Sequence, residues 1–281
     1  PFMLLLEKIH LRLSWLSIDV VLGALAGLVF FSKLLRIELE WQVFLLLGLA
    51  VWSIYTADHL LDSRQKTEVD LSPRHHFHLK YKNSLRISLG LVLICGLSLA
   101  YYTFGLSSEL VWSLILGTLI SASMLLIRLA GRRMAWAKEI SIALFYVLGI
   151  AWIPLLRVKV LDLSWEIFLF LGSYILLALI NLLILSHLDR RQDQLGGFFS
   201  SAFLFPPIKF IELIRRLCFL SLLIGLASFI LLPSFYRPFS CILTVMSLVH
   251  YLAFFNPKLS AEKVRLRTEA VFILPVLLYF L

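Results

Sequence analysis

Charged residues are scarce in this sequence, and that scarcity indicates the class of the protein. Of its 281 residues, 15% are charged and 60% are hydrophobic, and the mean hydropathy is +0.93. Soluble domains carry about 25% charged residues, so an ordinary soluble protein is excluded and an integral membrane protein is predicted. The net charge of +9 requires no nucleic-acid partner, because basic loops suit the anionic inner leaflet of a bilayer.

Cysteine is also rare, with three residues in the chain. Cys95, Cys218 and Cys241 lie in separate apolar segments without the spacing of a metal site. We therefore expect them to pack as small apolar side chains and to form no disulfide. The sequence has no low-complexity segment and no linker long enough to separate two domains, so we expect residues 1–281 to form a single helical domain.

Apolar runs of about 18 to 22 residues dominate the sequence, and each is long enough to cross about 30 Å of hydrocarbon as a helix. Their length favours helical spans over the short alternating strands of a membrane barrel. The predicted fold class is all-α, a polytopic membrane protein with about nine transmembrane helices in one bundle around a central cavity. The expected spans are 15–35, 41–62, 84–104, 108–128, 136–156, 164–188, 211–233, 238–255 and 267–281.

The distribution of lysine and arginine predicts the orientation of these spans. Five of the 26 basic residues lie on one side of the expected membrane, and the others lie on the opposite side. The five are Lys33, Arg36, Arg157, Lys159 and Arg237. Because cytoplasmic loops retain positive charge, we expect the N-terminus inside and the C-terminus outside, in a multi-pass protein of a bacterial inner membrane.

Two pairs of aspartates stand at the cytoplasmic ends of the second and sixth expected spans. Asp58 and Asp62 in "YTADHLLDSRQ" are four residues apart, and so are Asp189 and Asp193 in "SHLDRRQDQLGG". Helical geometry places residues i and i+4 on one face, where like charges repel and the C-terminal end of the helix dipole disfavours anions. A cation is therefore expected at each pair, and ligands that are all acidic oxygens favour Mg²⁺.

Basic residues in the loops after these two spans suit a diphosphate, whose charge they would neutralise together with Mg²⁺. Their positions are Arg64, Lys66, Arg74, Lys80, Lys82, Arg190 and Arg191. The run "PRHHFHLK", which contains Arg74, is expected to cover the diphosphate and not to bind zinc, because it has no cysteine or acidic partner. Four carboxylates, Mg²⁺ and a diphosphate together predict a site for a leaving group, with its opening toward the cytoplasm.

The second aspartate pair lies in a longer pattern that resembles the UbiA superfamily of intramembrane prenyltransferases, whose second motif runs DxxxDxxxGxxSxAxLF. The matching positions in "DRRQDQLGGFFSSAFLF" are Asp189, Asp193, Gly197, Ser200, Ala202, Leu204 and Phe205. The first family motif, NDxxDxxxD, is matched by Asp58 and Asp62. Its leading pair is not matched, because this chain has Ile54 and Tyr55 there.

A family lysine that stands eleven residues before a glycine is matched by Lys138 and Gly149, so the resemblance covers essentially the whole chain. It implies a Mg²⁺-dependent enzyme in which the four aspartates bind the metal and a prenyl diphosphate is the substrate. Arg64, Arg74 and Lys138 are the residues expected to contact the diphosphate. Its departure leaves an allylic carbocation, which an acceptor captures inside the bundle; the motifs do not identify the acceptor or the chain length.

Two leucines depart from the family pattern on the sixth expected span. Leu182 and Leu185 stand where many relatives carry an aspartate and a tyrosine, which removes polar groups from the site wall. Asn181 lies on nearly the same helical stripe as Asp189, and we expect it either to supply a polar group there or to make an interhelical hydrogen bond. The aromatic residues that could stabilise a carbocation are Tyr55, Phe145, Tyr146 and Trp152.

Three functions follow from these features. The first is a prenyltransferase that joins a prenyl group to a small or lipophilic acceptor. The second is a terpene cyclase of the same architecture, in which a double bond of the substrate itself captures the cation. The third is a noncatalytic membrane protein or transporter, for which we expect an ionisable residue near the middle of the membrane or helices broken by glycine; neither is evident.

The orientation can be tested with cysteines placed beside the aspartate pairs. In a background without the three native cysteines, Ser63→Cys and Gln194→Cys should react with a membrane-impermeant thiol reagent from the cytoplasmic side only. Mg²⁺ and diphosphate together should slow both reactions, because the adjoining loops become ordered around a shared site. Reaction of the two positions from opposite faces would exclude a shared site, and with it every enzymatic function considered above.

Overall fold

The computed structural model of the chain describes residues 16–62, 73–195 and 200–280, and these ranges are almost entirely helical, without a β-strand. The longer helices are α2 (Ile18–Leu34), α3 (Trp41–Asp62), α5 (Lys82–Phe104), α6 (Ser108–Ala130), α7 (Ala135–Arg157), α8 (Trp165–Leu195), α9 (Pro207–Leu231) and α10 (Arg237–Phe254). The shorter elements are α4 (Pro73–Lys80), η2 (Gly131–Met134), η3 (Val160–Asp162), η4 (Ser201–Phe203), η5 (Ser234–Tyr236), α11 (Ala261–Ala270) and η6 (Val271–Phe280), where η denotes a 3₁₀ helix.

Seven of the described helices, α3 and α5 to α10, are long and apolar enough to cross a membrane. This confirms the prediction of an all-α, multi-pass membrane protein. The first expected span corresponds to α2, which has 17 residues. The last expected span, 267–281, begins in the last turn of the polar helix α11 ("AEKVRLRTEA") and continues as the apolar 3₁₀ helix η6 ("VFILPVLLYF"). The count of nine spans therefore stays a prediction.

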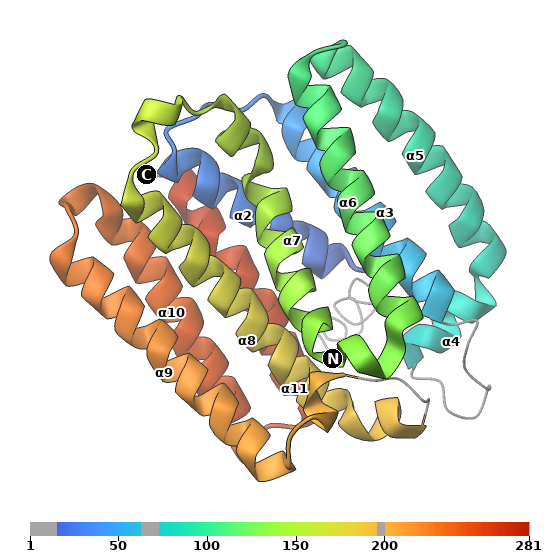
Figure 1. Cartoon of the computed structure of the whole chain (residues 1–281), viewed down its shortest axis with the longest axis vertical. Helices are drawn as coiled ribbons and strands as arrows, with labels where there is room; N and C mark the ends of the chain where they lie inside the picture. Colours follow the sequence, from blue (N-terminus) through green and yellow to red (C-terminus); the bar gives the residue numbers. More distant parts are fainter. Residues whose placement is uncertain (1–15, 63–72, 196–199, 281) are drawn as a thin grey trace, which may run out of the picture.

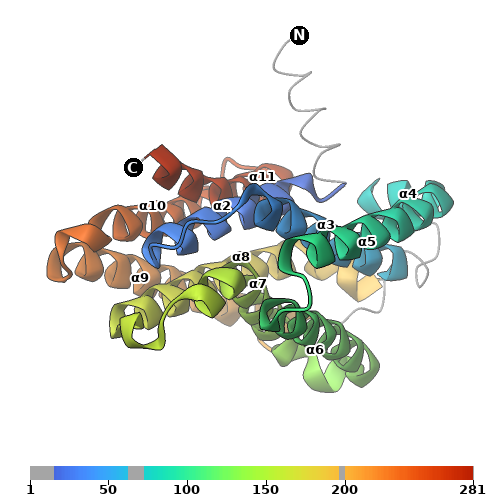
Figure 2. The same ribbon diagram turned by 90° about the horizontal axis from the view of Figure 1, so that it is seen from above.

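The outer faces of α5 and α6 are largely apolar beyond the first turn of α5, which carries exposed Lys82, Asn83 and Ser84. Large side chains such as Leu91, Ile94, Leu119 and Leu126 are more than half exposed. Figure 2 shows these two helices at the periphery of the bundle. Contiguous apolar surface of this size is rare on soluble proteins and suits contact with lipid.

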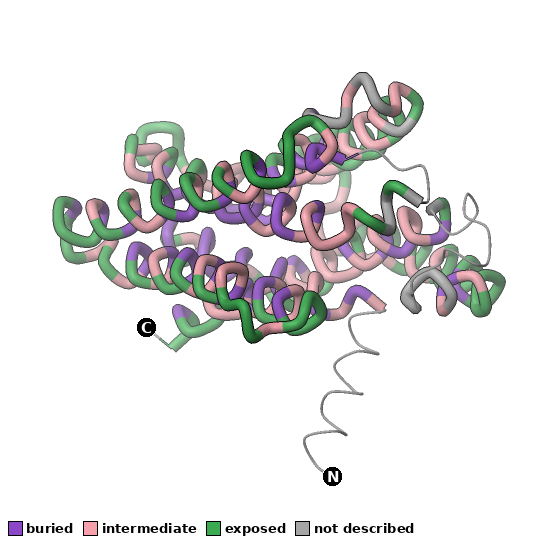
Figure 3. Tube along the Cα trace, turned by 90° about the horizontal axis from the view of Figure 1, so that it is seen from below, coloured by how far each residue is buried: buried purple, intermediate pink, exposed green. Residues whose placement is uncertain are grey.

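The described helices close into a ring. Each long helix contacts the next one along the chain, and η6 returns to contact α2. Buried residues follow the inward faces of the helices, whereas exposed residues lie on the outer faces (Figure 3). α2 also packs against α7 across the ring, so it separates a half formed by α3, α5, α6 and α7 from a half formed by α8 to α11.

The contact across the ring depends on a glycine. A Cβ added at Gly27 would lie 2.5 Å from Cδ1 of Ile150 and 3.1 Å from the hydroxyl of Tyr174, so the Ile150 side chain would have to shift. Ile150 and Tyr174 are themselves almost fully buried, which leaves them little room to move. In the same contact region, which we call the seam of α2 with α7 and α8, Phe30 packs against Tyr174. Their ring centroids are 5.4 Å apart, in an edge-to-face geometry that aromatic pairs favour.

α3 and α8 run in the same direction and reach the same end of the bundle, where α4 and the beginning of α11 also lie (Figure 1). We call this end the motif end, because α3 and α8 carry the two aspartate pairs there. α8 has 31 residues, which is about 46 Å of helix at 1.5 Å per residue. It is longer than the hydrocarbon is thick, so its last turns lie at the polar border of the membrane.

At the opposite end of the bundle, Arg157 at the end of α7 forms ion pairs with Glu40, just before α3, and with Glu109 of α6. Its guanidinium donates to Glu40 over 2.7 Å and to Glu109 at the start of α6 over 3.1 Å. The hydrogen bond from Arg157 lowers the pKa of Glu40 below its usual 4.5. Because the folded-state pKa of this carboxyl is depressed, the pair stabilises the fold above that pH and its contribution is lost as the pH falls.

The close approach at Gly27 can be tested by adding a side chain. Gly27→Leu should lower the free energy of unfolding by about 1–3 kcal/mol or more, because α2 must move away from α7 and α8. Thermal unfolding in detergent would measure this. Gly172→Leu is the matched control, since Gly172 lies in α8 with open space around its Cα. Equal melting temperatures for the two variants would contradict a tight seam.

Candidate functional site

A largely apolar cavity of about 440 Å³ lies in the half of the ring formed by α3, α5, α6 and α7, with α2 at its inner wall. α6 lines it along a stripe from Leu110 to Ile127, which is about 25 Å of helix at 1.5 Å per residue. This length is close to the ~30 Å thickness of the hydrocarbon of a bilayer. α8 contributes Leu182 to the wall.

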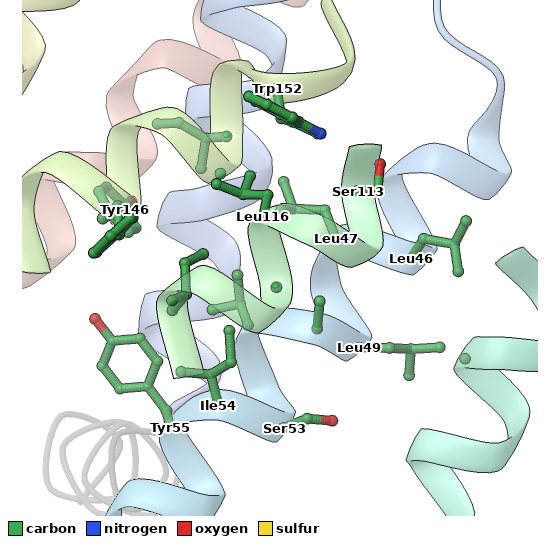
Figure 4. A pocket seen from close by; sticks show the side chains of 18 of the residues that line it. Leu46, Leu47, Leu49, Ser53, Ile54, Tyr55, Ser113, Leu116, Tyr146 and Trp152 are labelled. Carbon is green, nitrogen blue, oxygen red and sulfur yellow. The ribbon is translucent and has the colours of Figure 1, made fainter. Parts of the chain in front are cut away.

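Asp58 lies in the wall of this cavity, near the end of α3. Tyr55 stands one turn before it and extends toward Tyr146 of α7, whereas Trp152 lies at the far end of the cavity (Figure 4). Phe145 also lines the wall, so all four aromatic residues singled out in the sequence surround one cavity. The cavity is thus apolar and aromatic along its length, with a carboxylate at the motif end.

The histidine-containing helix α4 packs against α3. The ring of His78 is buried and stands 5.0 Å from the ring of His59, the residue that follows Asp58 in α3. His59 in turn stands 6.4 Å from the ring of Tyr55. Within the described part of the chain no three histidine, cysteine or acidic residues are grouped as a metal site.

Asp189, the first residue of the second aspartate pair, is held by a contact at the end of α8. Asp189 accepts a hydrogen bond from the guanidinium of Arg265, which comes from α11, and the two side chains are 35% and 29% exposed. The neighbouring Arg190 lies over the ring of Phe203 at 5.7 Å and donates to the carbonyl of Phe205 at 3.5 Å. The end of the second motif therefore folds back onto its beginning.

The other expected site residues lie at the same end or outside the described structure. Lys138 is half-buried in the first turns of α7, which begins at the motif end. Asn181 does not line the cavity, and its Oδ1 is buried without a hydrogen-bond partner. The side chains of Asp62, Arg74 and Asp193 lie outside the described part of the structure, although their backbones belong to α3, α4 and α8, and Arg64 lies outside it altogether.

Two charged residues near the second motif were missed from the sequence. Arg265 belongs to the basic segment "AEKVRLRTEA", whose charge pattern indicates the orientation of the chain but no contact with Asp189. Glu139 follows Lys138 and accepts a 3.0 Å hydrogen bond from the backbone N–H of Ser201. An acidic residue inside an otherwise apolar span is itself a signal of function, and it was available in "AKEISIALF".

Comparison of the chain with protein-family models, with curated proteins and with solved structures gives no match. The resemblance to the UbiA superfamily therefore rests on the motif residues themselves. What the structure adds is their placement, with both aspartate-bearing helices ending at one end of the bundle and Asp58 in the wall of a long cavity.

The contact between Asp189 and Arg265 can be measured with a double-mutant cycle. Asp189→Asn and Arg265→Gln should each lower the unfolding free energy of the metal-free protein, and the pair should show a coupling energy of about 0.2–1 kcal/mol. The value is small because both side chains are partly exposed. Arg267→Gln, at an exposed position on the same helix, is the control. Strict additivity would mean that the contact carries no energy.

Proposed function

We propose that the protein is a Mg²⁺-dependent intramembrane prenyltransferase, which ionises a polyprenyl diphosphate and transfers the prenyl group to a small or lipophilic acceptor. The observation that supports this best is the cavity, which is apolar and aromatic along its length and has Asp58 in its wall at the motif end. A prenyl diphosphate has a long apolar chain and a highly charged head. A substrate of this class matches both parts of the cavity.

The charged head would lie at the motif end, where α3 and α8 carry their aspartates. The four aspartates supply only oxygen ligands, which suits Mg²⁺. Bound Mg²⁺ would neutralise the charge that develops on the departing diphosphate. Arg64, Arg74 and Lys138 would donate hydrogen bonds to phosphate oxygens.

The apolar part of the cavity would receive the prenyl chain and protect the carbocation from water. Water at this point would end the reaction as an alcohol, so a dry wall is required. The faces of Tyr55, Phe145, Tyr146 and Trp152 would stabilise the positive charge through their π-electrons. The acceptor would enter the same volume and form the new bond to the prenyl carbon.

We further propose that α2 and the unit formed by α11 and η6 complete nine membrane crossings around the cavity. α2 and η6 pack against each other, and both contribute buried apolar residues to the core. The motif end would then face the cytoplasm of a bacterial inner membrane, because the lysines and arginines of the chain concentrate in the segments at that end.

A terpene cyclase is the second candidate, and one observation favours it. Leu182, which stands where many members of the UbiA superfamily carry an aspartate, lies in the cavity wall. A wall with fewer polar groups binds a polar acceptor less well. Capture of the cation by a double bond of the substrate itself requires no such acceptor.

Product analysis decides between these functions. Purified protein would be given geranyl, farnesyl and geranylgeranyl diphosphate with Mg²⁺, with and without aromatic acceptors, and the products identified by mass spectrometry. A prenylated acceptor supports the transferase, and a cyclic hydrocarbon or alcohol without acceptor supports the cyclase. Intact substrates under all conditions would exclude both enzymes and leave a noncatalytic membrane protein or transporter.

The metal site can be tested by neutralising each carboxylate. Asp58→Asn, Asp62→Asn, Asp189→Asn and Asp193→Asn should each lower turnover by about 100-fold or more while the protein still folds and inserts, because the lost charge removes a metal ligand. Asp162→Asn is the control, since Asp162 lies exposed in η3, between the end of α7 and the start of α8. Wild-type rates in all four variants would overturn the site assignment.

A further inference from the structure

Glu139 is a buried carboxylate that the proposed metal site does not use. It lies in the second turn of α7 and is 4% exposed. Its Oε1 accepts the 3.0 Å hydrogen bond from the backbone N–H of Ser201, whereas its Oε2 has no hydrogen-bond partner in the described structure. The bond joins residues that are 62 positions apart, so it connects α7 to the segment that follows the second aspartate pair.

A carboxylate at this position needs an explanation beyond packing. Burial of a carboxylate is costly, and one hydrogen bond does not offset its desolvation. However, a bond from an N–H group to a carboxylate is about twice as strong as a bond to a neutral acceptor. Glu139 therefore holds the backbone of Ser201 more firmly than a glutamine would.

Ser201 stands at the start of a short helix, where its backbone N–H needs a partner from outside that helix. It is the first residue of η4, and the first N–H groups of a helical turn have no partner within that turn. η4 contacts both α7 and α8. Ser200 and Ala202, on either side of Ser201, are buried as well.

The same segment is attached to α8 from its other side. Arg190 contacts the ring of Phe203 and the carbonyl of Phe205, and Arg190 directly follows Asp189. The segment from Ser200 to Phe205 is thus anchored to α7 through Glu139 and to the aspartate-bearing end of α8 through Arg190.

We propose that Glu139 is a positioning residue for the second aspartate motif. By holding Ser201 against α7, its carboxylate fixes the segment that follows α8, and with it the end of α8 that carries Asp189. The consequence for catalysis rests on the proposed function, because it assumes that this motif binds Mg²⁺. Groups that orient metal ligands in this way typically change metal affinity by about 10- to 100-fold when they are removed.

The structural part of the proposal is tested by amide hydrogen exchange in the metal-free protein in detergent. Glu139→Ala should raise exchange at Ser201 by about tenfold or more and should also raise it at the end of α8. Glu139→Gln should give a smaller rise, because its amide oxygen accepts the same bond without the charge. Glu212→Ala, which removes an exposed carboxylate of α9, is the control and should change neither region. Unchanged exchange in Glu139→Ala, or an equal effect of glutamine and alanine, would overturn the proposal.

The catalytic part is tested by the Mg²⁺ requirement. Glu139→Ala should raise the Mg²⁺ concentration for half-maximal turnover by about tenfold or more and leave most of the rate at saturating Mg²⁺. A merely structural role would lower the amount of folded protein without changing that concentration. An unchanged Mg²⁺ requirement in correctly folded Glu139→Ala would therefore overturn the positioning role.

Ser201→Pro removes the donor and leaves Glu139 in place, which provides a second route to the same bond. Proline is tolerated at the start of a helical turn, and the backbone of Ser200, with φ −129° and ψ 166°, has the extended conformation favoured before proline. The variant should reproduce the Mg²⁺ shift of Glu139→Ala, and the double variant should shift no further. Additive shifts would overturn the proposal.

Failure of the proposed function gives a different result from failure of this inference. If the wild-type protein converts no prenyl diphosphate, the enzyme proposal fails. Hydrogen exchange at Ser201 and at the end of α8 then still decides whether Glu139 positions the motif. If the wild-type protein is active and the exchange data show no effect of Glu139→Ala, the inference about Glu139 fails alone.

Discussion

The close contact of α2 with α7 and α8 at Gly27 is the constraint on which the rest of the bundle depends. A ring of helices without a cross-contact would enclose a wide volume that side chains could not fill. Because Gly27 has no side chain, α2 approaches Ile150 and Tyr174 closely enough to fill one part of the ring with core. The other part keeps a cavity, bounded by α3, α5, α6 and α7. The cavity therefore lies on one side of the α2–α7 contact and not at the centre of the ring.

At the motif end the constraint is electrostatic, because acidic and basic side chains lie close together at the ends of the helices. The C-terminal ends of α3 and α8 disfavour carboxylates, yet each carries an aspartate pair. At α8 the structure supplies one compensating charge, Arg265 of α11. α11 is polar for the same reason, since it lies at the motif end, where it can bring a guanidinium to α8 without exposing apolar surface. The polar α11 is followed directly by the apolar η6.

Several features were predictable because they depend on local pattern. The apolar runs predicted the helices, since a helix must span the hydrocarbon with apolar side chains. The spacing of Asp58 and Asp62 predicted a shared face, and the shared direction of α3 and α8 predicted a common end. Tyr55, Phe145, Tyr146 and Trp152 were candidates because an aromatic face can stabilise a carbocation, and all four line the cavity.

Other features required the tertiary structure. Arg265 lies 76 residues from Asp189, and Ser201 lies 62 residues from Glu139, so no periodicity connects either pair. Leu182 and Asn181 are neighbours in α8, yet only Leu182 lines the cavity, because successive residues of a helix point about 100° apart. By itself the sequence determined an all-α membrane protein with two acidic motifs on parallel helices, since composition and helical period suffice for that. Which side chains meet at the motif end, and where the cavity lies, was decided only by packing between helices, since those contacts join residues far apart in the chain.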